Sequence, residues 1–205
     1  MTTRRFIASF ALPCAVAALL GASPWLGANS AQDTEKKAAE EKPIPQYNGV
    51  KKCKMCHSTP KTGAQYKKWT EGRHSKAFET LGSDAAKKIA AEKGLGDPRK
   101  EAACLKCHVA GYGKEKKFYT ADYKMEDGVS CEACHGPSSL WDKKELHAGK
   151  REEAMKLGMT HPVEATCKTC HNEESPSYKP FDFKTAWEKI SHMRPKEAAE
   201  GAEKK

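Results

Sequence analysis

The sequence predicts one mainly helical domain with few or no strands and a thin side-chain core. Only 38% of its 205 residues are hydrophobic, and the mean hydropathy is −0.78. It has no long Val- and Ile-rich runs of the kind that buried parallel strands require. It has nine cysteines, and eight of them follow residue 50. Groups other than aliphatic side chains must therefore stabilise the interior.

The first 30 residues have the organisation of a secretory signal peptide. Arg4 and Arg5 give a positive start, an apolar run follows over residues 6–20, and Ala28 and Ser30 form a small-residue cleavage pattern. The alternative is an uncleaved membrane anchor. Export to the periplasm would place the cysteines in an oxidising compartment.

Composition divides the rest of the chain into three parts. Residues 31–46 are charged and Pro-punctuated, as in a flexible leader. Residues 47–193 hold the eight cysteines and form the expected domain, and residues 194–205 are a charged tail. The cysteine spacings within the domain are irregular, so a stacked repeat array is not expected.

The eight later cysteines form four copies of one motif, Cys-x-x-Cys-His. Because His makes up 8 of 205 residues, four accidental histidines at this position would occur with a probability of roughly 2 × 10⁻⁶. The motif attaches haem c: two thiols bond the vinyl groups of one porphyrin edge, and the adjacent His supplies the proximal iron ligand. The cofactor-binding cysteines are Cys53, Cys56, Cys104, Cys107, Cys131, Cys134, Cys167 and Cys170. The proximal ligands are His57, His108, His135 and His171.

Two other uses of paired cysteines fit less well. Zinc knuckles use Cys-x-x-Cys pairs but do not require a His after every second Cys. A thioredoxin-like redox pair accounts for one motif but not for four. The sequence therefore predicts four covalently bound haems, whose flat apolar faces form most of the core and on which the fold depends.

The basic composition does not imply nucleic-acid binding. Loss of Arg4 and Arg5 with the first 30 residues leaves 34 basic against 27 acidic residues. The propionates of four haems would bring the formal charge close to zero. The lysines remain open to two interpretations, a docking face for an acidic redox partner or a solvated surface.

Three local features are expected around the motifs. Ser83 caps a short helix that runs to about Lys93. Gly136 and Pro137 end the third motif sharply. Residues 117–123 alternate in a way that favours one hairpin.

Two histidines outside the motifs lie in expected helices and are candidate distal iron ligands. His74 falls on an aromatic face of a helix expected over residues 65–81. His147 falls on the apolar side of a helix expected over residues 138–157. Each would complete an iron with two imidazole ligands.

The other two histidines have less regular surroundings. His192 follows an apolar stripe over residues 183–190, and Pro195 favours an unwound helix end. Met193 competes with His192, and a thioether ligand would raise the potential of that haem. His161 lies in a loop, where ligation of the second haem, a propionate contact and an exposed side chain all remain open.

Four segments resemble the cytochrome c-554 family, the tetrahaem electron carriers of ammonia-oxidising bacteria. They are Lys52–His57, Trp69–Phe78, Cys104–Gly113 and Gly128–Pro137. The resemblance extends from about Lys51 to His192 and implies a mainly helical fold with haems in stacked pairs. It also implies electron transfer from a periplasmic oxidoreductase, hydroxylamine oxidoreductase in the namesake, toward a membrane quinone-linked cytochrome.

The resemblance further implies unequal irons. Three haems would have two His ligands, with His147 on the first haem, His74 on the third and His192 on the fourth. The second haem, held by His108, would keep an open face.

The sequence therefore predicts a periplasmic electron carrier and not an enzyme. It has neither a glycine-rich nucleotide loop nor a Ser-His-Asp arrangement. The expected partners are a redox protein as donor and another as acceptor, and no nucleic acid. Peripheral contact with a membrane remains open. The expected oligomeric state is a monomer or a weak dimer. One alternative is an enzyme that acts on nitric oxide, nitrite or hydroxylamine at an open second haem. Another is a haem filament in which His192 ligates a neighbouring copy.

Overall fold

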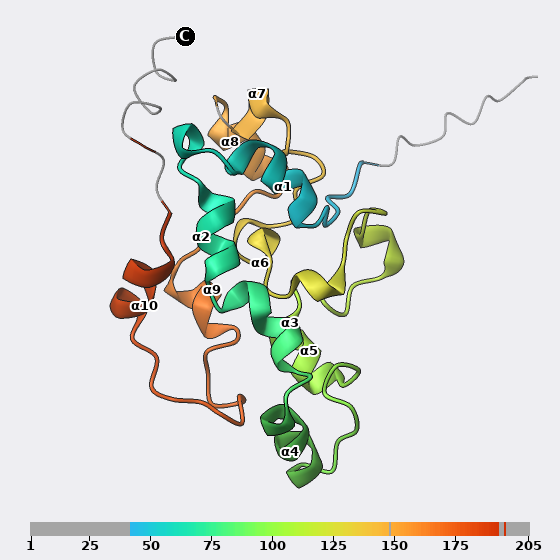
Figure 1. Cartoon of the computed structure of the whole chain (residues 1–205). Helices are drawn as coiled ribbons and strands as arrows, with labels where there is room; N and C mark the ends of the chain where they lie inside the picture. The colour runs from blue at the N-terminus through green and yellow to red at the C-terminus, as the bar shows by residue number, and fades with distance from the viewer. Residues whose placement is uncertain (1–41, 148, 193–194, 196–205) are drawn as a thin grey trace, which may run out of the picture. The chain divides into compact units, whose positions relative to one another are not determined.

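A computed structural model describes residues 42–147, 149–192 and 195. The expected signal peptide, the first part of the leader, Met193 and the tail apart from Pro195 lie outside these residues. The described chain is a succession of short helices joined by loops, from α1 in blue to α10 in red (Figure 1). None of the described helices is long and apolar enough to cross a membrane.

The α-helices of the described chain have at most nine residues each. They are α1 (Val50–His57), α2 (Gln65–Glu71), α3 (Ala77–Thr80), α4 (Asp84–Glu92), α5 (Ala102–His108), α6 (Cys131–His135), α7 (Lys144–His147), α8 (Arg151–Lys156), α9 (Glu164–Lys168) and α10 (Phe183–Ile190). Single 3₁₀ turns lie at Pro60–Thr62, His74–Lys76, Lys116–Phe118 and Met125–Asp127. The mainly helical prediction is confirmed.

The expected hairpin over residues 117–123 does not form. This segment pairs with the entry to the domain: Tyr47 N donates to Phe118 O (2.8 Å) and Thr120 N donates to Tyr47 O (3.0 Å). The result is an isolated parallel bridge between Tyr47 and Tyr119, and the described residues contain no β-strand.

Two helices expected as continuous are broken at glycine. Gly72 ends α2 in an extended conformation (ψ 165°), so His74 starts a separate 3₁₀ turn. The helix expected over residues 138–157 divides into α7 and α8, with Gly149 between them. A glycine has little preference for helix, and local packing decides the chain direction there.

Two other local predictions are confirmed. Ser83 caps α4, and its hydroxyl accepts a hydrogen bond from Ala86 N (3.2 Å). Gly136 ends α6 with φ +79°, and a Cβ there would lie 2.2 Å from Gly158 O. The close approach of these two backbone segments explains why glycine occupies this position.

Buried apolar side chains in the described chain form two small clusters. One combines Leu81 with Leu105 and Val109 of the second-motif region. The other is made of Trp141, Ala154 and Met159. Such small clusters agree with the prediction that aliphatic packing contributes little to this interior.

Candidate haem-binding site

Each motif occupies one turn of helix, which brings its three functional side chains to one face. The first motif lies at the end of α1 and the second at the end of α5. The third motif forms the whole of α6. The fourth starts in α9 and stays helical beyond it, because His171 N donates to Cys167 O (3.0 Å). Positions i, i+3 and i+4 of a helix are neighbours, so two thiols and one imidazole project together.

The eight motif cysteines of the described domain form no disulfide. No group of three or more His, Cys, Asp and Glu in the described ranges has an arrangement that could hold a metal ion. The paired cysteines thus remain available for thioether bonds and do not converge as a Cys₄ zinc site does. This geometry fits haem attachment better than the zinc alternative.

Three proximal histidines are oriented through their Nδ1 atoms. These atoms contact Gln65 Oε1 for His57 (3.2 Å), Ala77 O for His108 (2.6 Å) and Thr160 O for His135 (3.4 Å). A carbonyl acceptor at Nδ1 leaves Nε2 as the basic nitrogen for a metal. His171 is held differently, stacked on Phe181 with ring centroids 4.6 Å apart. These residues fit an iron ligand role.

Thiols of different motifs lie against each other. A hydrogen bond with Cys131, followed by burial, raises the pKa of Cys53, so the first and third motifs meet. Burial and the nearby Cys170 raise the pKa of Cys107 to about 11, so the second and fourth motifs meet.

The third and fourth motifs are also neighbours. Burial and then the charge of Cys167 raise the pKa of Cys134 to about 11. The motifs therefore form a continuous series in the order first, third, fourth, second.

The ring of His74 lies beside His171 of the fourth motif, with centroids 6.1 Å apart. The backbone of His74 is held elsewhere: its carbonyl accepts a hydrogen bond from Val129 N (3.1 Å), just before the third motif. Burial and the charge of His171 lower the pKa of His74, which favours the neutral imidazole that binds metals.

Two histidines lie beside His135 of the third motif. The ring of His192 is 6.0 Å away and that of His161 is 6.4 Å away, centroid to centroid. His161 directly follows Thr160, whose carbonyl contacts Nδ1 of His135. Burial and the charge of His192 lower the pKa of His135 to about 4.

The ring neighbours of His74 and His192 differ from the pairing that the family resemblance implies. The resemblance pairs His74 with the third haem and His192 with the fourth, whereas His74 lies beside His171 and His192 beside His135. The break at Gly72 turns His74 away from the preceding helix face, and α10 ends at Ile190, which frees His192. His147 ends α7, and its side chain lies outside the described residues.

Sequence reasoning did not identify the polar residues that hold the motifs. Gln65 and Thr160 orient proximal histidines, and Glu132 is buried inside the third motif. A glutamate between two haem-binding cysteines on a buried turn is the one signal that points to such a role. The acceptors for Nδ1 lie at the start of α2, at the start of α3 and in the loop before α9, and they have no sequence signature.

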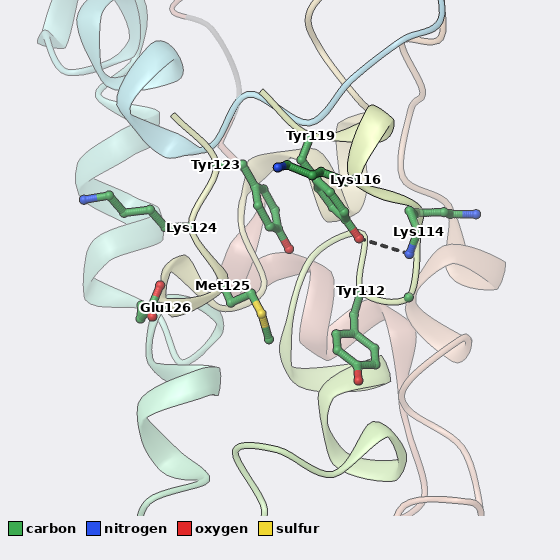
Figure 2. A pocket seen from close by; sticks show the side chains of 9 residues that line it. Tyr112, Lys114, Lys116, Tyr119, Tyr123, Lys124, Met125 and Glu126 are labelled. Carbon is green, nitrogen blue, oxygen red and sulfur yellow. Dashed lines mark hydrogen bonds between the residues drawn. The ribbon is translucent and has the colours of Figure 1, made fainter. Parts of the chain in front are cut away.

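An open pocket of about 620 Å³ lies beside the second motif. Its lining residues Tyr112, Tyr123 and Met125 pack against the same cluster as Cys104. Figure 2 shows these three side chains between Lys114 and Lys124, whose ammonium groups point outward on opposite sides.

Comparisons with known proteins find similar sequences and one similar structure. The family model for cytochrome c554 and c-prime matches residues 52–136. Cytochrome c-554 from Nitrosomonas europaea is 32% identical over 149 residues, which make up 65% of this chain and 61% of that relative. The chain thus spans less than two thirds of the relative's length. A solved structure of reduced cytochrome c554 from the same organism is 27% identical with a TM-score of 0.49, covering 71% of this chain and 78% of that one.

Helical Cys-x-x-Cys-His turns with oriented imidazoles define a multihaem c-type cytochrome, a protein that carries covalently bound haem c. Within this class, the chain is similar to cytochrome c-554, both over residues 52–136, which the family model matches, and over the 149 residues aligned with the relative.

Proposed function

We propose that the protein is a periplasmic tetrahaem electron carrier that links a periplasmic oxidoreductase to a membrane or soluble redox partner. The observation that carries the proposal is the continuous series of motifs. Thiol contacts link the first motif to the third and the fourth to the second, and Cys134 lies near Cys167. Haem supplies reversible one-electron chemistry when bound, and the chain holds four attachment sites close together.

The ring contacts support an assignment of the histidines that would ligate each iron when haem is bound. Metal–imidazole bonds are about 2 Å long, so two imidazoles across one iron have centroids roughly 6 Å apart. His74 with His171 and His192 with His135 have this separation. We assign His74 to the fourth haem and His192 to the third, and retain His147 for the first as the family resemblance suggests.

The lysines beside the second motif support a docking site for the redox partner. Lys114, Lys116 and Lys124 are exposed around the pocket, and within the described chain none of them forms an ion pair. Tyr112 and Met125 supply an apolar floor (Figure 2). An apolar centre with a charged rim is typical of protein interfaces, and its positive charge favours an acidic partner.

Haem content and redox behaviour test the proposal directly. Intact mass and the haem spectrum of the purified protein should give four haems per chain. A spectroelectrochemical titration should then show reversible couples for all of them. A chain with fewer haems, or with haems that do not cycle reversibly, would contradict the proposal.

A second candidate function is small-molecule redox chemistry at the second haem. His161, the candidate ligand for this haem, lies beside His135, and His108 has no ring contact with another described histidine. An open iron there would bind nitric oxide in the reduced protein. Optical titration with nitric oxide tests this function, and four fully low-spin haems without an adduct would exclude it.

The filament alternative receives less support. It needs His192 to ligate a neighbouring copy, whereas His192 lies against His135 of its own chain. Sedimentation of the holoprotein should give a monomer or a weak dimer. Open-ended assembly with loss of the His192 ligand in dilute protein would favour the filament instead.

A further inference from the structure

Glu132 lies between the two cysteines of the third motif, and only 2% of its surface is exposed. Its Oε1 accepts hydrogen bonds from Asn48 N (2.8 Å), Ser138 N (2.8 Å) and Ser138 Oγ (2.7 Å). Its Oε2 accepts one from Gly49 N (2.8 Å). Every partner is a donor, which suits an ionised carboxylate. Each donor is also neutral, so the hydrogen bonds stabilise the charge without cancelling it.

These bonds join the third motif to the helix of the first. Gly49 is the residue before α1, and Glu132 occupies the position of an anion at the helix N-terminus. Val50 N, the first amide of α1, donates to Asp127 Oδ2 (3.2 Å). Two carboxylates from one segment thus hold the N-terminus of α1, and Cys53 meets Cys131 beside them.

The negative charge of Glu132 acts on its surroundings. Burial raises the pKa of Tyr47 most, and the charge of Glu132 raises this pKa further. It also adds to the raised pKa of Cys53, after the hydrogen bond with Cys131 and burial. Charges in a buried region are weakly screened, so the charge of Glu132 would act on a haem attached to either motif.

We propose that Glu132 positions the first haem against the third and lowers the reduction potentials of both. Oxidation of an iron adds a positive charge, which a nearby carboxylate stabilises. Ser138 moderates the effect, because its two hydrogen bonds withdraw charge from Oε1. The inference rests on the proposed function, since it requires haems on both motifs.

Two substitutions in the holoprotein should shift the potentials in opposite directions. Glu132→Gln removes the charge, so two of the reversible couples should move to more positive potential. Ser138→Ala removes one hydroxyl donor and leaves a less neutralised carboxylate, so the same two couples should move to more negative potential. A purely structural disturbance would not reverse its sign in this way.

Ser139→Ala is the matched control. Ser139 Oγ accepts from Gln46 N (2.8 Å) and is adjacent to Ser138, but it makes no hydrogen bond with Glu132. Spectroelectrochemical titration of the four proteins should leave the Ser139→Ala couples at wild-type values. The remaining couples should stay in place in all variants.

Several outcomes would overturn the inference. They are unmoved couples in Glu132→Gln, equal shifts of all couples, or shifts of the same sign in Glu132→Gln and Ser138→Ala. If Glu132→Gln does not mature with its haems, the comparison of Ser138→Ala with Ser139→Ala becomes the test. In that case, the absence of a negative shift in the potentials of Ser138→Ala overturns the inference. Loss of reversible couples in the wild-type protein would instead overturn the proposed function, so the two failures are distinguishable.

Discussion

His74 and His171 face each other with ring centroids 6.1 Å apart, although one follows the first motif and the other belongs to the fourth. The carbonyl of His74 is meanwhile bonded to Val129 N, at the entry to the third motif (3.1 Å). One short turn therefore connects three haem motifs. Its position explains how a chain with small aliphatic clusters can hold the motifs in a defined order.

Replacement of His74 should expose one iron. In His74→Ala we expect the fourth haem to change from low-spin to high-spin, because a strong axial ligand is lost. EPR and optical spectra of the oxidised holoprotein measure this change. Ser75→Ala, which removes a neighbouring hydroxyl bonded to Gly72 O (2.8 Å), is the control. Unchanged spin states in His74→Ala would contradict the assignment.

His192 and His161 should behave differently although both lie beside His135. We expect His192→Ala to produce a high-spin third haem. We expect His161→Ala to leave the spin state of every haem as it is in the wild type. The reason is that His161 follows Thr160, on the Nδ1 side of the His135 ring. The same spectra test both variants. A new high-spin signal in His161→Ala alone would reverse the assignment.

The close contact at Gly136 should make this glycine irreplaceable. Gly136 and Gly113 both have positive φ, +79° and +84°, but a Cβ would lie 2.2 Å from Gly158 O at position 136 and within 4 Å of nothing at position 113. We expect Gly113→Ala to cost about 1 kcal/mol from backbone strain. Gly136→Ala should cost more than about 3 kcal/mol, because two backbone segments must separate. Denaturant unfolding of the holoproteins, followed by circular dichroism, compares them, and equal losses would argue against the contact.

Neutralising the pocket lysines should weaken the binding of an acidic partner. For the combined change Lys114→Gln, Lys116→Gln and Lys124→Gln, we expect the affinity for a polyglutamate peptide to fall about tenfold at low salt. Calorimetry at several salt concentrations measures it.

The control for this experiment changes three exposed lysines in and around α4, namely Lys88, Lys93 and Lys100, to Gln. Their loss should change the affinity little. An equal loss of affinity in both triple variants would mean that the peptide responds to the total charge of the protein and does not bind at this surface. Binding to anionic vesicles that depends on the pocket lysines, without peptide binding, would indicate a membrane contact instead.

The N-cap of α10 should make the start of this helix sensitive to acid. Asp182 Oδ1 accepts a hydrogen bond from Thr185 N (2.7 Å), and hydrogen bonds with Thr185 lower the pKa of Asp182 below its ordinary 3.8. A depressed carboxyl pKa contributes stability that is complete above pH 3.8 and is lost as the pH falls through the lower folded-state value.

Asp182→Asn keeps a capping oxygen that does not titrate. Thermal unfolding at neutral pH and below pH 3.8 should therefore show a smaller acid-induced loss for Asp182→Asn than for the wild type. Hydrogen exchange of the α10 amides should show the same difference. An identical acid response in both proteins would contradict the role of this cap.

Local predictions succeeded where the signal is contained in a few adjacent residues. The Ser83 cap and the end of the third motif at Gly136 are of this kind, because each depends on one turn of chain. The long helices predicted through Gly72 and Gly149 failed, because side-chain periodicity continues across a glycine even where the backbone does not. The hairpin over residues 117–123 failed because its edge pairs with Tyr47, far away in sequence.

The sequence by itself determined the chemistry of this protein. Four Cys-x-x-Cys-His motifs specify covalent haem attachment, because the thiols and the proximal imidazole must lie within one helical turn. The tertiary structure alone decided which motifs are neighbours, which distant histidine faces which proximal one, and that Glu132 joins the first motif to the third. Those relationships join residues that are far apart in the chain, and they are set by packing between loops, for which neither periodicity nor spacing carries a signal.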